Sequence, residues 1–145
     1  MNIRIAPADE SAALSIEAHL LDDLRQHLPQ AENNRFIFTA TSNNGVLIGG
    51  VTASTAYSRL HIETLWVHKE HRRNGLGKAL MHQVESAGRN AGCHSAWLDT
   101  SNPQAKLFYD ELGFTVFGEL QNNTKQLPAL HTRWFMKKNI ALDGV

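Results

Sequence analysis

A short basic segment rich in glycine, placed between an apolar strand and an amphipathic helix, constrains this chain more than any other feature. The segment reads Arg72-Arg73-Asn74-Gly75-Leu76-Gly77-Lys78. Glycine lets backbone N–H groups turn toward an anion without interference from a Cβ atom, and a helix start adds partial positive charge. The arginines and the lysine add full charges that suit a diphosphate. The segment therefore predicts an anion-binding loop at the start of a helix.

Two other phosphate-binding loops do not fit this spacing. A nucleoside-triphosphate P-loop requires glycine at position 72 and Ser or Thr at position 79, where this chain has Arg72 and Ala79. A dinucleotide-binding loop requires a third small residue at the position of Leu80. A helix start with surface arginines would carry the same short Gly-x-Gly, so the loop alone does not identify a ligand.

The flanking sequence predicts strands and helices around this loop. Strand patterns cover residues 3–5, 35–41, 46–56, 60–68, 95–100, 114–120 and 131–137. Helical spacing covers residues 9–28, as one helix or two short ones, and residues 75–91 and 102–112. The apolar alternation slips between Ile62 and Leu65, which a β-bulge would absorb. We expect one α+β domain over residues 1–145, with a loose tail over residues 139–145.

A second motif lies downstream of the loop. Residues 102–114 read NPQAKLFYDELGF, a pattern of Asn, Ala, Phe-Tyr and Gly-Phe, and the loop itself fits Arg/Gln-x-x-Gly-x-Gly/Ala through Arg72, Gly75 and Gly77. In this order and separation, the two motifs resemble those of the GCN5-related N-acetyltransferase (GNAT) superfamily. The resemblance is strong over residues 60–120 and generic over the first fifty-nine residues.

The resemblance implies a fold and a co-substrate. It implies a mixed, mostly antiparallel sheet of about seven strands, flanked by helices and splayed between the fourth and fifth strands. Acetyl-CoA would insert into the splay, with its pyrophosphate on the basic loop, and would donate its acetyl group to a primary amine of a small molecule or peptide. The residues expected to bind it are Leu65, Trp66, Val67, Arg72, Arg73, Asn74, Gly75, Leu76, Gly77, Lys78, Asn102, Lys106 and Tyr109.

Amide formation from a thioester needs a neutral amine and a protonated or stabilised leaving thiolate. The resemblance places Tyr109 beside the sulfur of CoA, as the acid that protonates the thiolate. For the base, Glu63 lies two residues before Leu65 in an otherwise apolar strand. His61 has the same side-chain parity, and His131 begins the last predicted strand. A water relay without a dedicated base is a fourth option.

The acceptor is less well defined by the sequence. In such a fold its specificity would come from the first helical region, the loop near residues 57–59 and the segment 121–133. The N-terminal part is acidic through Glu10, Glu17, Asp22, Asp23 and Glu32, which suits a cationic acceptor but is also typical of a solvated helix face. A non-catalytic acetyl-CoA-binding regulatory module is the alternative function. It could dispense with Tyr109 and Glu63, and both are present.

Composition and cysteine content exclude several other classes. The chain has 14 basic and 14 acidic residues and a pI of about 7.1, which does not favour nucleic acid as a partner. His68 and His71 lack a third ligand nearby, so we expect no metal. With one cysteine, no signal-peptide pattern and no apolar run of about 20 residues, we expect a cytoplasmic enzyme without membrane association. A homodimer is compatible with the sequence.

Overall fold

The computed structural model describes residues 2–28 and 33–142. The chain divides into two compact units, residues 1–31 and 32–145, and each is described by itself. The first unit contains helix α1 (Glu10–His27), which begins where the side chain of Asp9 accepts a hydrogen bond from the backbone N–H of Ala12. The helical pattern over residues 9–28 is therefore one continuous helix.

The strand expected over residues 3–5 is wrong. Ile3 and Ile5 lie in a segment without strand pairing. Two alternating isoleucines make a very short pattern, and Pro7, which follows them, has no N–H to contribute to a ladder. The sheet of the described residues consequently has six strands instead of the seven expected. Because the first expected strand does not form, each later strand is numbered one lower. The splay predicted between the fourth and fifth strands therefore lies between the third and fourth.

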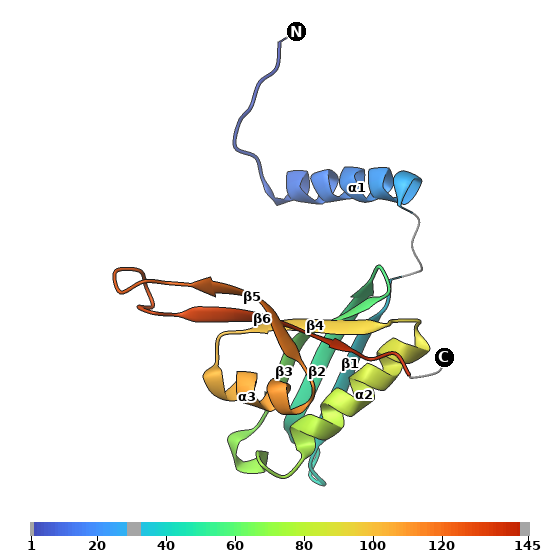
Figure 1. Ribbon diagram of the computed structural model, residues 1–145. Helices are drawn as coiled ribbons and strands as arrows, with labels where there is room; N and C mark the ends of the chain where they lie inside the picture. Colours follow the sequence, from blue (N-terminus) through green and yellow to red (C-terminus); the bar gives the residue numbers. More distant parts are fainter. Residues whose placement is uncertain (1, 29–32, 143–145) are drawn as a thin grey trace. The chain divides into compact units, whose positions relative to one another are not determined.

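The second unit contains the sheet and two further α-helices (Figure 1). Its elements in chain order are β1 (Arg35–Thr41), β2 (Leu47–Ala56), β3 (Arg59–Val67), a short 3₁₀ turn (Lys69–His71), α2 (Leu76–Asn90), β4 (Ser95–Thr100), α3 (Pro103–Glu111), β5 (Thr115–Gln121) and β6 (Thr132–Asn139). The strand order is β1-β2-β3-β4-β6-β5. Every neighbouring pair is antiparallel except β3 and β4, which are parallel. The predicted α+β class with a mixed, mostly antiparallel sheet is confirmed.

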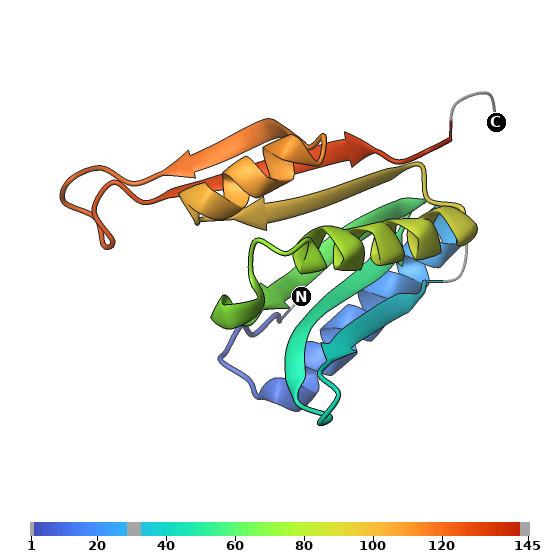
Figure 2. The same ribbon diagram turned by 90° about the horizontal axis from the view of Figure 1, so that it is seen from below.

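Helices α2 and α3 cover the same face of this sheet (Figures 1 and 2). Helix α2 packs on β1, β2 and β3, and α3 packs on β4. The buried core between the helices and the sheet includes Leu60, Met81, Leu98, Phe114 and Met136. Each half of the sheet thus has its own covering helix, with the parallel pair β3–β4 at the boundary between the halves.

The parallel pair β3–β4 separates soon after it begins. Its ladder holds three residue pairs, Arg59↔Ser95, Leu60↔Ala96 and His61↔Trp97. Beyond them β3 continues to Val67 alongside β2, while β4 remains paired with β6 (Figure 2). Both strands therefore have unpaired backbone edges that face each other across an opening, which is the splay that the family resemblance implies.

The first two residues of the predicted loose tail are ordered. Asn139 ends β6, and Ile140 is 3% exposed and donates its backbone N–H to the carbonyl of His94. The loose tail predicted over residues 139–145 is therefore wrong for Asn139 and Ile140. Residues 143–145 lie outside the described part of the chain. The single domain predicted over residues 1–145 stays a prediction, because the two units are described separately.

Candidate active site

A β-bulge positions Glu63 in the opening. Along the β2–β3 ladder, Thr52 pairs with Thr64 and Ala53 pairs with Ile62, so Glu63 is the extra residue on β3. This confirms the bulge predicted between Ile62 and Leu65. A bulge re-aims the side chains on its strand, which is why a carboxylate can sit inside an apolar strand without entering the core.

A cavity of about 320 Å³ occupies the opening between β3 and β4. Four of the predicted site residues line it together: Glu63, Leu65, Asn102 and Tyr109. They come from β3, from the N-cap of α3 and from α3 itself. The remaining lining residues are Ile62, Thr64, Leu98, Asp99, Thr100 and Ala105. The predicted acid and the predicted base therefore line one cavity, although they are 46 positions apart in the sequence.

Tyr109 combines a core position with access to this cavity. Its side chain is 8% exposed, and its ring packs edge-on against Phe108 and Phe114, with centroids 5.2 and 5.7 Å away. Burial raises the pKa of Tyr109 from 10.0 to about 12, because the phenolate would lose its hydration. The hydroxyl is therefore a neutral proton donor across the whole pH range in which proteins work.

The other two predicted residues around α3 have partners of their own. Asn102 is the N-cap of α3, and its Oδ1 accepts a hydrogen bond of 2.9 Å from the backbone N–H of Gln104. The side-chain amide N–H groups of Asn102 remain as donors toward the cavity that it lines. Lys106 pairs with Asp110 at 3.1 Å and lies over the ring of Trp134. Lys106 does not line the cavity.

The basic loop has the backbone of an anion site. Arg73 and Gly75 both have left-handed backbones, with φ of 66° and 83°. Gly75 is the N-cap of α2 and makes no side-chain capping bond, so the first N–H groups of this helix have no side-chain acceptor at the cap. Turns with left-handed residues group successive N–H groups into concave anion sites. The loop therefore fits a phosphate group.

The second glycine of the loop has a packing role. A Cβ atom on Gly77 would lie 3.3 Å from the ring of Phe108 and 3.7 Å from Val67. Gly77 consequently lets α2 approach α3 and the end of β3 closely. This differs from the expectation that both glycines clear space for an anion, since only Gly75 has the left-handed conformation of this pair.

The charged side chains of the loop divide into two groups. The Nε–H of Arg72 donates to the carbonyl of Val67 at 2.8 Å, which ties the loop to the end of β3. Arg73 and Lys78 are exposed and have no ion pair among the described residues.

Of the remaining predicted cofactor residues, Trp66 and Asn74 are exposed and Leu76 begins α2. Trp66 reaches the opening through its backbone, since it lies on the part of β3 beyond its ladder with β4.

The histidines considered as bases lie elsewhere. His61 stacks flat on Trp97, with ring centroids 3.9 Å apart, and His131 bonds to the hydroxyl of Ser101 at 2.7 Å. Neither lines the cavity between β3 and β4. His68 and His71 have ring centroids 5.9 Å apart. Within residues 2–28 and 33–142, no group of three or more His, Cys, Asp or Glu side chains could hold a metal ion.

Sequence reasoning missed Asp99 as a site residue. Asp99 lies on β4, lines the cavity and forms an ion pair with Arg133 of β6. The sequence contained a usable signal, because aligning the two short parallel strands 60–68 and 95–100 would have placed an acid on each side of the splay. Strand patterns alone do not provide that alignment, since parallel register depends on the connecting helix.

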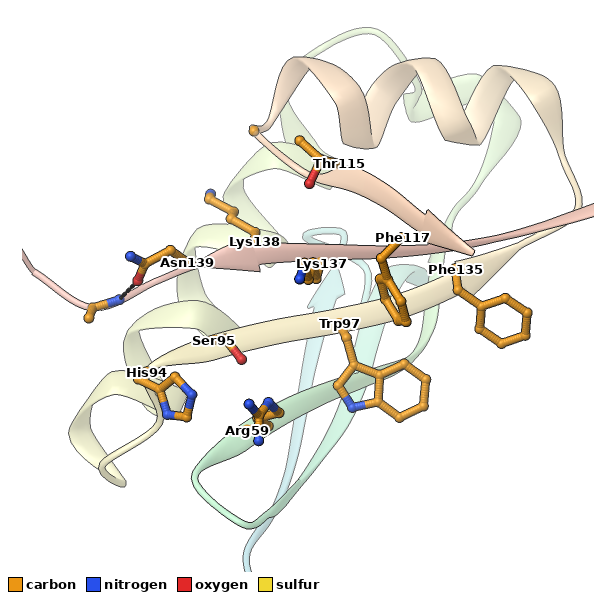
Figure 3. A pocket seen from close by; sticks show the side chains of 12 residues that line it. Arg59, His94, Ser95, Trp97, Thr115, Phe117, Phe135, Lys137, Lys138 and Asn139 are labelled. Atoms are coloured by element: carbon orange, nitrogen blue, oxygen red, sulfur yellow. Dashed lines mark hydrogen bonds between the residues drawn. The ribbon is translucent and has the colours of Figure 1, made fainter. Parts of the chain in front are cut away.

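A larger hollow of about 1010 Å³ lies on a different part of the same unit (Figure 3). Trp97, Phe117 and Phe135 project into it from β4, β5 and β6. Their neighbours Leu98 and Met136 have the opposite parity and belong to the core under the helices. The hollow therefore lies on the sheet face away from α2 and α3. It contains none of the predicted site residues.

An anion loop, an opened parallel strand pair and a cavity with an acid and a tyrosine define a site for a group-transfer enzyme with a long anionic co-substrate. Residues 5–114 match the Acetyltransferase (GNAT) family, so the chain belongs to that family. It is an acetyl-CoA-dependent N-acetyltransferase. Within the described residues, no helix is long and apolar enough to span a membrane.

Individual relatives agree with this assignment. Acetyltransferase Atu2258 of Agrobacterium fabrum is 28% identical over 113 residues, which cover 78% of this chain and 82% of that protein. Blasticidin-S acetyltransferase of Streptomyces morookaense is 33% identical over 78 residues, or 53% of this chain and 57% of that protein. An acetyltransferase structure from Bacillus cereus has a TM-score of 0.84 at 24% identity, covering 94% of this chain and 97% of that one, and shows the fold.

Proposed function

We propose that this enzyme transfers the acetyl group of acetyl-CoA to a primary amine of a small molecule or peptide, inside the cavity between β3 and β4. The observation that carries this proposal is the joint lining of one cavity by Glu63 and Tyr109. Acetyl-CoA would extend from this cavity, along the open edge of β3, to the loop at Arg72–Lys78. A non-catalytic acetyl-CoA binder would have no use for an acid and a base in the same cavity.

The proposed reaction balances through one proton on each side. The amine nitrogen attacks the thioester carbonyl, a C–N bond forms and the C–S bond breaks. Glu63 accepts the proton that the nitrogen loses, directly or through a water molecule. Tyr109 donates its hydroxyl proton to the departing thiolate and later recovers one from solvent, to which Glu63 releases the proton that it accepted. The net products are an acetamide and free CoA thiol.

The burial of Tyr109 supports its proposed role as the acid. Its pKa of about 12 means that it always holds a proton to donate. The same apolar surroundings would raise the pKa of a thiol whose sulfur lay beside the ring, because a thiolate loses hydration in the same way. The first effect keeps Tyr109 protonated until the thiolate forms, and the second makes the departing sulfur a better proton acceptor.

The position of Glu63 supports its choice over the other bases. Its side chain is 30% exposed and lines the cavity, whereas His61 and His131 are engaged with Trp97 and Ser101. A water between Glu63 and the amine would complete the same transfer. The name of the blasticidin-S relative supports a small-molecule acceptor. The match covers 57% of that protein. A homodimer and a cytoplasmic location stay predictions.

A screen of primary amines, with release of free CoA thiol as the readout, tests the proposed function. We expect thiol release that depends on the amine, with one acetylated product molecule per thiol in mass spectrometry. The panel should include monoamines, diamines, aminoglycosides and peptides with free N-termini. Tight binding of acetyl-CoA without amine-dependent thiol release from any member would instead support the regulatory module.

A further inference from the structure

One carboxylate from each of the two strands lines the opening. The β3–β4 ladder ends at His61↔Trp97, and two residues further along each strand stand Glu63 and Asp99. Both line the same cavity of about 320 Å³. The flat stack of His61 on Trp97, with 3° between the ring planes, fixes the two strands to each other at the point where they separate. Each acid therefore lies on its own strand just beyond the point where the two strands separate.

An arginine from another strand lies beside each carboxylate. Like charges that share one cavity repel each other, so these two carboxylates need compensation. Nη2 of Arg35, on β1, lies 3.8 Å from Oε2 of Glu63, and Arg35 is largely exposed. Nη1 of Arg133, on β6, contacts Oδ2 of Asp99 directly. The compensation of Glu63 is thus weak, and that of Asp99 is close and directional.

The contact with Arg133 leaves the second oxygen of Asp99 available. A carboxylate can accept hydrogen bonds at both oxygens, and Arg133 contacts Oδ2. Among the described residues, no other donor contacts Asp99. The side chain is 26% exposed and lines the cavity, so Oδ1 is accessible to a ligand there. Arg133 meanwhile restrains the carboxylate in one orientation.

The reacting amine needs only one of these two carboxylates. That amine must be neutral when it attacks, so it needs one proton acceptor and gains little from a second carboxylate. We propose that Asp99 binds a second amino group of the acceptor, one that stays protonated during the reaction, and that Arg133 is a positioning residue that holds Asp99 in place. The acceptor class is then a diamine or polycationic amine. This inference rests on the proposed function and names its substrate class.

Matched acceptors test the inference. Diaminobutane and butylamine have the same carbon chain and differ by one amine. The wild type should prefer diaminobutane in kcat/KM by at least about tenfold. Asp99→Asn should remove most of that preference, because it raises the KM for diaminobutane more than the KM for butylamine. Glu111→Gln, an exposed acid at the end of α3, is the control and should retain the preference.

A second variant separates recognition from folding. Arg133→Gln keeps the carboxylate of Asp99 and removes its restraint, so it should weaken the preference by less than Asp99→Asn does. Melting temperatures identify any variant that loses its fold. Equal use of both amines by the wild type would overturn this inference and leave the proposed function standing. An equal loss of both activities in a folded Asp99→Asn would also overturn it. Absence of acetylation of any amine by the wild type would overturn both proposals.

Discussion

Tyr109 has two environments that ordinarily conflict. Its ring belongs to the core, between Phe108 and Phe114, and the residue also lines the cavity between β3 and β4. A buried tyrosine costs little while it is neutral, because its ring packs as an apolar group. Ionisation is penalised, since the phenolate would be poorly hydrated. The same burial that makes Tyr109 a lasting proton donor therefore links it to stability at high pH.

The first prediction concerns this linkage. The folded-state pKa of Tyr109 is raised from 10.0 to about 12, so below about pH 10 both states hold the proton and nothing is lost. As the pH rises from about 10 toward 12, the unfolded state ionises first and is favoured. The loss in unfolding free energy should approach about 2 kcal/mol. Urea unfolding at several alkaline pH values measures it.

Two variants identify the residue responsible. Tyr109→Phe should unfold with a shallower decline above about pH 10, because it lacks the ionising group. Tyr57→Phe removes the other tyrosine of the chain, which is 43% exposed, and should keep the decline of the wild type. The same pH dependence in Tyr109→Phe and the wild type would show that Tyr109 does not ionise differently in the two states.

At the scale of single elements, the start of α2 determines whether the loop holds a phosphate. Gly75 has a φ of 83°, and a Cβ atom there would meet no heavy atom within 4 Å. A larger side chain at this position would therefore meet no steric obstacle, but its conformation would be strained. Its charge would lie where we expect the pyrophosphate of acetyl-CoA. Substitution of Gly75 by a charged residue therefore tests phosphate binding, and substitution by an uncharged residue controls for the backbone conformation.

The second prediction follows from this position. Gly75→Glu should lose most of the rise in melting temperature that CoA gives to the wild type, because its carboxylate repels the diphosphate. An affinity loss of at least about tenfold, or 1.4 kcal/mol, is expected in calorimetric titration. Gly75→Asn is the matched control, since Asn tolerates the left-handed conformation and is uncharged. If both variants kept the thermal shift of the wild type, the loop would not be the phosphate site.

Sequence patterns predict the local features of several helices and strands but not the pairing between distant strands. Periodicity placed β1 at Arg35–Thr41 and β4 at Ser95–Thr100, and the slip around Glu63 predicted a real bulge. These features are local, so neighbouring residues suffice to predict them. The strand at Ile3 and Ile5 failed because alternation without a pairing partner does not make a strand. The place of Asp99 in the cavity lining was missed because it depends on which strands lie side by side.

At the scale of the whole sheet-containing unit, the opening between β3 and β4 requires contacts that join its two halves. One of them is the ion pair between Glu85 of α2 and Lys138 of β6, whose Nζ and Oε1 atoms are 2.6 Å apart. Helix α2 covers β1 to β3, whereas β6 belongs to the other half. Glu85 is 4% exposed, so its charge depends on Lys138 for compensation.

The third prediction concerns this connection. Lys138→Met should lower the unfolding free energy by about 3 kcal/mol, because it leaves a buried carboxylate without a cation. The double variant Glu85→Leu/Lys138→Met should recover most of that loss, since both charges are replaced by apolar groups of similar size. Denaturant unfolding of the two variants provides the comparison. Equal stability of the single variant and the wild type would mean that the pair does not hold the halves together.

The central claim is that acetyl transfer takes place between β3 and β4 with Tyr109 as the acid. The most direct test is the turnover number of Tyr109→Phe, measured with the best amine of the panel at saturating acetyl-CoA, beside a calorimetric affinity for acetyl-CoA. We predict that kcat falls by about a hundredfold while the affinity changes by less than about twofold. An unchanged kcat, under conditions in which the chemical step limits turnover, would contradict the claim.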